Sequence, residues 1–210
     1  MNSKIRPFDE KSERYENWFD RNPAVYKSEL MAVGKLLSKE GKGIEIGVGS
    51  GRFSEPLSIF IGIDPSKEML QIAKKRGIRV IRGMGEYLPL KCSEFDFVLI
   101  VTTICFFDDV KLALREAYRI LKQGGKIIIG FIDKDSQVGQ EYQRKKEKNV
   151  FYKDAKFYSV NEGVELLRET GFSNFKYTQT IFDRLDSIDA VEKPKEGYGE
   201  GSFVVIKGKK

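Results

Sequence analysis

The residues with the clearest chemical potential form a short glycine-rich segment, Glu45-Ile46-Gly47-Val48-Gly49-Ser50-Gly51. An apolar run precedes this segment and a helical pattern follows it, which predicts a tight turn between a buried strand and a helix. Glycines in such a turn permit positive φ and let a ligand lie against bare backbone, while free N–H groups of the next helix attract a carboxylate or phosphate. A second apolar run ends in Asp64, whose carboxylate can accept both hydroxyls of a ribose. Together these features indicate a site for a ligand that contains a nucleoside.

The spacing of the glycines distinguishes between two kinds of nucleotide site. A dinucleotide site requires G-x-G-x-x-G/A, in which the third small residue allows close packing of helix on strand. Here Gly47 and Gly49 would place the bulky Arg52 at that third position. The pattern is instead E-x-G-x-G-x-G, and a pyrophosphate would gain nothing from the acidic Glu45. The spacing therefore counts against a nicotinamide-dependent Rossmann protein, which remains an alternative.

The residue types that are absent or rare limit the chemistry. The chain has no histidine, which excludes Ser-His-Asp and Cys-His catalysis. Its two cysteines, Cys92 and Cys105, lack C-x-x-C spacing, so neither a disulfide framework nor a metal site is expected. A catalytic base must then be a carboxylate, Tyr, Lys or Cys, unless the reaction proceeds by positioning alone.

The elements that position these residues follow from the hydrophobic pattern. Apolar runs alternate with helical patterns at 65–76 and 108–121, and runs without polar alternation are typical of parallel strands covered on both faces. This order predicts an α/β fold, a Rossmann-like doubly wound, mostly parallel sheet of about seven strands. The last two runs, 175–182 and 203–207, are joined without a helix and predict a C-terminal antiparallel hairpin.

Helices are also expected before the sheet. Residues 9–40 have helical spacing, and Asn22-Pro23 divides them into two helices that would cap the sheet. One face of the first helix is aromatic, and either static packing or a mobile lid over the ligand fits that pattern. The aromatic residues are Tyr15, Trp18 and Phe19.

Several ordered motifs over roughly residues 40–130 resemble those of the class I, Rossmann-like S-adenosylmethionine-dependent methyltransferases. IGIDPSKEMLQIAKKRG is similar to the second strand and helix of that family. The segments 83–89 (GMGEYLP), 94–98 (EFDFV) and 115–125 (REAYRILKQGG) resemble the family's G-D-A-E-x-L-P, S-F-D-x-V and R-x-L-K-P-G-G. The Y-x-x-W-F helix resembles that of small prokaryotic members of the small-molecule type, loosely labelled histamine-methyltransferase-like.

The resemblance implies a role for each matching residue. Glu45 and the glycines of the turn would hold the methionine end of S-adenosylmethionine, Asp64 would bind the ribose, and Thr102 would face the cofactor. Met84 stands where the family often has an Asp that binds the adenine amino group. The residues expected to bind the cofactor are Glu45, Gly47, Gly49, Gly51, Asp64, Pro65, Met84, Gly85, Glu86 and Thr102. Candidates for the acceptor pocket are Tyr15, Trp18, Phe19, Thr103, Cys105 and Phe106.

The resemblance favours an enzyme that moves a methyl group by in-line displacement to a nitrogen or oxygen nucleophile of a small molecule. The net charge of +6 keeps an RNA methyltransferase as an alternative, although nucleic acid is the less expected partner. A noncatalytic protein that binds S-adenosylmethionine is a further alternative. The sequence leaves the acceptor and the oligomeric state open.

Length and composition set the expected organisation. We expect one domain over residues 1–210, made of a helical cap (1–41), a cofactor-binding half (42–133) and a substrate-side half (134–210). No apolar run reaches the ~18 residues of a membrane span, and no signal-peptide core is present, so a cytoplasmic protein without membrane contact is expected. The high content of Lys and Glu is typical of a heat-adapted source.

Overall fold

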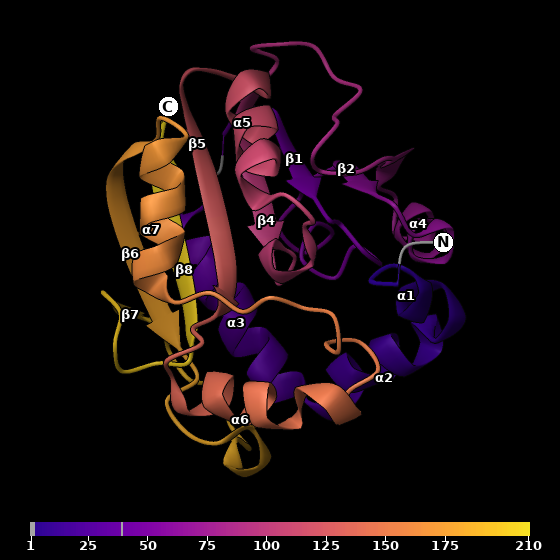
Figure 1. Cartoon of the computed structure of the whole chain (residues 1–210), viewed down its shortest axis with the longest axis vertical. Coiled ribbons are helices and arrows are strands. Elements are labelled where there is room, and N and C mark those ends of the chain that lie inside the picture. The colour runs from indigo at the N-terminus through magenta and orange to yellow at the C-terminus, as the bar shows by residue number, and fades with distance from the viewer. Residues whose placement is uncertain (1–2, 39) are drawn as a thin grey trace.

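The strands form one mixed sheet with the order β3-β2-β1-β4-β5-β8-β6-β7 (Figure 1). This computed structural model describes residues 3–38 and 40–210. Strands β1 to β5 run parallel to one another, whereas β8 runs antiparallel to both β5 and β6. The strands are β1 (Gly43–Ile46), β2 (Ile61–Asp64), β3 (Arg79–Arg82), β4 (Phe95–Val101), β5 (Leu121–Ile132), β6 (Ser173–Thr180), β7 (Lys195–Glu196) and β8 (Phe203–Lys209).

The predicted Rossmann-like, mostly parallel sheet is confirmed, and so is the antiparallel pairing of its last two long strands. The strand order changes direction between β1 and β4, which is the position where open α/β sheets form a ligand-binding crevice. The sheet of the described residues has an eighth strand, the two-residue β7 at the edge beside β6. A strand of that length has no hydrophobic alternation, so the sequence pattern could not predict it.

Helices cover both faces of this sheet (Figure 1). On one face α5 and α7 pack on β5, β6 and β8 and on each other. On the other face α3 packs on the same three strands. The helices are α1 (Arg6–Glu10), α2 (Ser12–Arg21), α3 (Pro23–Leu36), α4 (Lys67–Lys75), α5 (Val110–Ile120), α6 (Gln137–Lys145) and α7 (Val160–Glu169), with short 3₁₀ helices at Ile104–Phe106, Lys146–Lys148 and Leu185–Ser187.

Local sequence explains the helix boundaries. The predicted break at Asn22-Pro23 is confirmed, because α2 ends at Arg21 and α3 begins at Pro23, where the missing N–H is not needed. Ser159 starts α7 with a complete capping box. The additional short helix α1 precedes α2 and contacts α4.

The helix predicted directly after the glycine-rich segment is wrong. Residues 47–58 form consecutive turns. Pro56 lies in this segment and lacks the N–H that would bond to the carbonyl of Arg52 in a helix. That carbonyl instead accepts a hydrogen bond from the hydroxyl of Tyr26 in α3. The glycine-rich turn is therefore attached to the N-terminal helices.

Two irregular segments follow β5 and β6. Residues 134–158 contain α6 and one of the 3₁₀ helices, and residues 183–202 contain another 3₁₀ helix and β7.

Within residues 3–38 and 40–210, no helix combines the length and the apolar character that crossing a bilayer requires.

Candidate cofactor and acceptor site

A cavity of about 690 Å³, open solvent included, lies where the parallel strands end. Its walls come from the residues that directly follow β1, β2, β3 and β4 and from the N-terminal helices. Because the carboxyl ends of parallel strands meet at one edge of the sheet, residues distant in sequence lie together here. The predicted site residues in this lining are Tyr15, Gly47, Asp64, Pro65, Met84, Gly85, Glu86, Thr102, Thr103 and Phe106.

Other predicted residues lie outside this lining. Glu45 is buried, and its carboxyl accepts a hydrogen bond from the hydroxyl of Ser54. Burial raises the pKa of Glu45 to about 8. Gly49, Gly51, Trp18, Phe19 and Cys105 are also absent from the walls of the first cavity.

Asp64 joins the glycine-rich turn to the start of α4. Its carboxylate accepts hydrogen bonds from the backbone N–H groups of Gly49 at 2.9 Å and Ser66 at 2.8 Å. Burial raises the pKa of Asp64 to about 6, although both backbone donors oppose that rise. Asp9 of α1 accepts a hydrogen bond from the Ser66 hydroxyl at 2.7 Å. These contacts place α1 beside the first cavity.

The glycines of the turn have different surroundings. Gly47 has φ of +75°, and a Cβ at this position would lie 2.1 Å from Cγ2 of Thr103. Gly49 has φ of +51°, and a Cβ there would meet no atom within 4 Å. Gly47 thus allows close packing of the turn on the end of β4. Gly49 leaves free space at the backbone, as a ligand would require.

The end of β4 is shaped by two threonines. Thr102 has φ of +52°, a left-handed conformation that costs a non-glycine residue roughly 1 kcal/mol or more. Its N–H still donates to the carbonyl of Gly130 in β5, at 2.7 Å. The hydroxyl of Thr103 lies 3.1 Å from the carbonyl of Gly47, its hydrogen-bond acceptor in the turn. Backbone strain of this kind is typical of functional sites.

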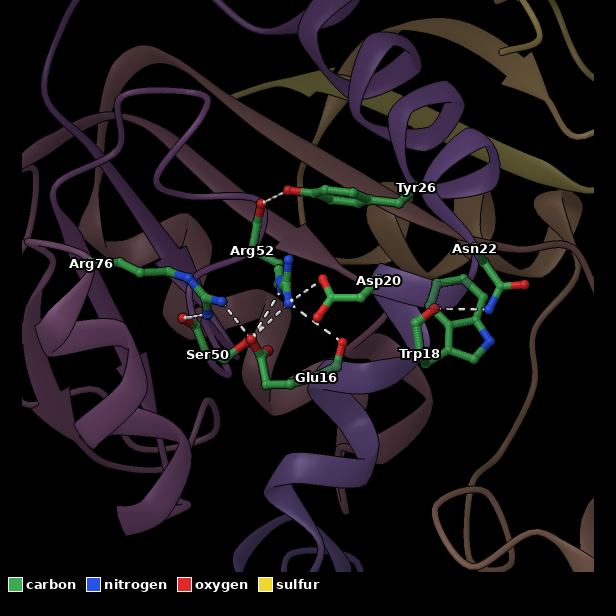
Figure 2. A network of polar contacts seen from close by, with 8 residues as sticks. All are labelled: Glu16, Trp18, Asp20, Asn22, Tyr26, Ser50, Arg52 and Arg76. Carbon is green, nitrogen blue, oxygen red and sulfur yellow. Dashed lines mark hydrogen bonds and ion pairs between the residues drawn. The ribbon is translucent and has the colours of Figure 1, made fainter. Parts of the chain in front are cut away.

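A network of charged groups attaches α2 to the glycine-rich turn (Figure 2). Figure 2 shows the guanidinium groups of Arg52 and Arg76 pointing toward Glu16. Arg52 lies 3.0 Å from Glu16 and 3.0 Å from Asp20, and Arg76 pairs with Glu16 and donates to the Ser50 carbonyl at 2.6 Å. Burial by itself would raise the pKa of Glu16, but the hydrogen bonds from the two arginines lower it on balance. The network holds α2 in place, and α2 in turn positions Tyr15 in the wall of the first cavity.

A second cavity adjoins the first. Its volume is about 1010 Å³ including open solvent, and Tyr15 and Thr102 line both cavities. The predicted acceptor residues Trp18 and Phe19 are in its walls. Further lining residues, which the sequence analysis missed, are Arg14, Glu29, Phe53, Ile132, Tyr142, Asn149, Phe151, Tyr152 and Leu185.

One of these lining residues, Glu29, could have been identified from the sequence. Glu29 follows Val25 by four residues and precedes Val33 by four, so it occupies the apolar stripe of α3. A single carboxylate on a buried helix face is unusual. The spacing alone could therefore have marked Glu29 as a candidate.

Cys105 lines neither of these two cavities but a third, smaller one beside them. Its thiol donates to the carbonyl of Thr102 at 3.6 Å. Burial raises the pKa of this thiol to about 12, so it is not a nucleophile at neutral pH. Phe106, in contrast, lines the first cavity and stacks on Tyr152, with ring centroids 5.8 Å apart.

Comparison with known proteins defines the class to which this fold and site belong. A family model described as a methyltransferase domain matches residues 44–129. A crystal structure from Thermotoga maritima, described as a SAM-dependent methyltransferase and "possible histamine N-methyltransferase", is 53% identical, with a TM-score of 0.96 and coverage of 98% of this chain and 99% of that chain. An uncharacterized protein of Methanocaldococcus jannaschii is 55% identical over 97% of this chain and 98% of its own length. The uncharacterized methyltransferase YcgJ of Bacillus subtilis is 30% identical over 54% of this chain and 53% of its own length.

The fold and the matches define an enzyme of the Rossmann-like methyltransferase class. The chain belongs to the S-adenosylmethionine-dependent methyltransferases, and S-adenosylmethionine is its cofactor.

The residues of the first cavity fit this cofactor. Asp64 presents a carboxylate in the cavity wall, and Gly49, which donates its N–H to Asp64 from outside the lining, leaves open space at its own backbone. Oε2 of Glu86 is buried and, within the described part of the chain, has no hydrogen-bond partner. An acceptor atom of that kind can be satisfied by a donor group of a ligand.

Proposed function

We propose that this enzyme transfers the methyl group of S-adenosylmethionine to a nitrogen or oxygen nucleophile of a small molecule. The second cavity carries this proposal. It shares Tyr15 and Thr102 with the first cavity, and aromatic side chains form much of its wall. Concave sites whose walls are predominantly aromatic and apolar are typical of small-molecule binding.

The proposal assigns each half of the chain a role. Residues 42–133 would hold the cofactor, with Asp64 at the ribose and Met84, Gly85 and Glu86 at the adenine. The glycine-rich turn would hold the methionine end, and the charge of the methionine ammonium would favour the carboxylate form of the buried Glu45, whose pKa burial raises to about 8. Residues 134–158 and 183–202 would shape the acceptor site, since Tyr152 and Leu185 from these segments line the second cavity.

The cofactor supplies a methyl group already activated by a sulfonium, so the protein contributes mainly alignment and exclusion of water. The charged network at Glu16 fixes α2, and the aromatic side chains of that helix close one side of the second cavity. A dedicated base is optional, because an acceptor with an acidic proton can lose it to solvent. The description of the Thermotoga maritima relative names an amine acceptor, which is consistent with a nitrogen nucleophile here.

We also propose that the enzyme acts in the cytoplasm without a nucleic-acid partner. Cys92 and Cys105, the two cysteines of the chain, are both free, as expected in a reducing compartment.

The test is incubation of the enzyme with S-adenosylmethionine and a panel of amines, phenols and carboxylic acids, with total RNA in parallel. Mass spectrometry would identify the methylated product, and formation of S-adenosylhomocysteine would give the rate. We expect methylation of a small molecule at a rate that changes little with salt. Methylation of RNA alone, with RNA affinity that falls steeply as salt rises, would replace this proposal with the RNA alternative.

A further inference from the structure

Glu29 is a buried carboxylate without a partner. It lies on α3, is 4% exposed, and lines the second cavity. In residues 3–38 and 40–210, its carboxyl makes no hydrogen bond and no ion pair. Buried carboxylates are normally paired or hydrogen-bonded, because an isolated charge loses its hydration in the protein interior. An unpaired carboxyl that faces a cavity indicates a ligand with a complementary group.

The surroundings of Glu29 favour a cation. The lining of this cavity includes the aromatic rings of Tyr15, Trp18, Phe19, Tyr142, Phe151 and Tyr152. Tyr142 and Tyr152 lie against each other with centroids 5.3 Å apart. The faces of aromatic rings carry partial negative charge and attract organic cations. A carboxylate within a group of such rings is therefore complementary to an alkylammonium ion.

The remaining titratable groups of the lining do not neutralise Glu29. Arg14 is the other charged side chain of the described lining, and it is exposed on α2 without an ion pair to Glu29. The phenol groups of Tyr15, Tyr142 and Tyr152 stay neutral, because burial raises the pKa of each. Burial likewise raises the pKa of Glu29 to about 8. The free enzyme thus holds a group that can be a carboxylate or a carboxylic acid near neutral pH.

We propose that the methyl acceptor is a small protonated amine, and that Glu29 binds its ammonium group among these aromatic rings and accepts its proton before methyl transfer. This inference rests on the proposed function, and it names the substrate class and the proton acceptor of the same site.

The proposed reaction consists of a proton transfer followed by the methyl transfer. The ammonium R–NH₃⁺ gives one proton to the Glu29 carboxylate, which leaves neutral R–NH₂ and a carboxylic acid. The nitrogen lone pair then forms the new N–C bond, while the C–S bond breaks and its electron pair stays on sulfur. The products are R–NH₂–CH₃⁺ and S-adenosylhomocysteine, and Glu29 returns its proton to solvent when the product leaves.

The first experiment measures binding to the wild-type protein saturated with S-adenosylhomocysteine. Calorimetry would compare a series of primary amines, such as 2-phenylethylamine and histamine, each with the alcohol of the same carbon skeleton. We expect at least one amine to bind about tenfold or more tightly than its alcohol. Equal affinity within every pair would overturn the inference without any variant being made.

The second experiment repeats these titrations with Glu29→Gln, which keeps the shape of the side chain and removes the charge. Glu13→Gln is the matched control, because Glu13 is exposed on the neighbouring α2 and does not line the cavity. We expect Glu29→Gln to lose the preference for amines, whereas Glu13→Gln keeps it and both variants bind S-adenosylmethionine like the wild type. An amine preference that survives in Glu29→Gln contradicts the role of this residue.

The pH profile of kcat/KM separates proton acceptance from simple binding. For Glu29→Gln we expect the residual activity to rise as the pH approaches the pKa of the free amine, because the acceptor then arrives neutral. Profiles of equal shape in variant and wild type would overturn the proton-acceptor role.

These measurements also distinguish the two proposals from each other. If the protein binds S-adenosylmethionine and methylates only phenols or acids, the proposed function stands and the amine inference fails. If it methylates no small molecule, the proposed function itself fails.

Discussion

Replacing Glu16 with glutamine removes the charge on which Arg52 and Arg76 converge. The three side chains are 15%, 19% and 24% exposed, so solvent screens their contacts only in part. A hydrogen bond to a charged group contributes about 1.5–3 kcal/mol, whereas an exposed ion pair contributes about 0–1 kcal/mol. Glutamine keeps one acceptor oxygen, so we expect the free energy of unfolding to fall by about 2 kcal/mol. For a chain of this length that loss lowers Tm by about 4–8 °C.

Urea denaturation followed by circular dichroism, together with calorimetry, measures this loss, with Glu13→Gln as the exposed control on the same helix. Because the pKa of Glu16 is lowered in the folded state, its contribution is full above its unfolded pKa of about 4.3 and is lost as the pH falls through the folded pKa. The difference between wild type and Glu16→Gln should therefore shrink in acid. A loss below about 0.5 kcal/mol at pH 7, or a loss of equal size at pH 3, would refute the reasoning.

Three further predictions concern the two cavities. Asp64→Ala should weaken S-adenosylmethionine binding about tenfold or more, and unchanged affinity in calorimetry would contradict the ribose assignment. Gly47→Ala should lower the free energy of unfolding by roughly 1–3 kcal/mol. The loss should exceed that of Gly49→Ala, because only the first substitution introduces a Cβ against Thr103. Equal losses in urea denaturation would contradict this packing. Because the pKa of Glu29 is raised in the folded state, the wild type should lose stability relative to Glu29→Gln as the pH rises from about 4.5 to about 8. Urea titrations across that pH range test this, and a difference that does not vary with pH would contradict burial of an ionisable carboxyl.

The part of the fold that depends on repeating patterns could be predicted from the sequence. Continuous apolar runs marked the parallel strands, and the Asn22-Pro23 break marked the boundary between α2 and α3. The residues that follow parallel strands meet at one edge of the sheet, so Gly47, Asp64 and Thr102 could be placed together before any contact was known.

The remaining features depend on single contacts between distant segments. Pro56 was visible in the sequence as a residue that interrupts a helix. The bond between Tyr26 and the Arg52 carbonyl, which attaches these turns to α3, is contained in no local pattern. The second cavity depends on α6 and on the loop that carries Tyr152. Both lie in residues 134–158, a segment whose sequence shows no periodic hydrophobic pattern that would predict their positions. The position of Glu29 on an apolar helix face was visible in the sequence, but its meaning required the aromatic side chains around it.

The position of β8 has a consequence for synthesis of the protein. β8 follows β6 in the chain, yet in the sheet it lies between β5 and β6. On the ribosome, β5 and β6 therefore emerge before the strand that joins them, and the edge of β5 has no partner until residues 203–209 are made. Unpaired strand edges promote association between nascent chains. A chain truncated before residue 203 should thus aggregate more than the full chain, because it lacks the strand that covers these edges.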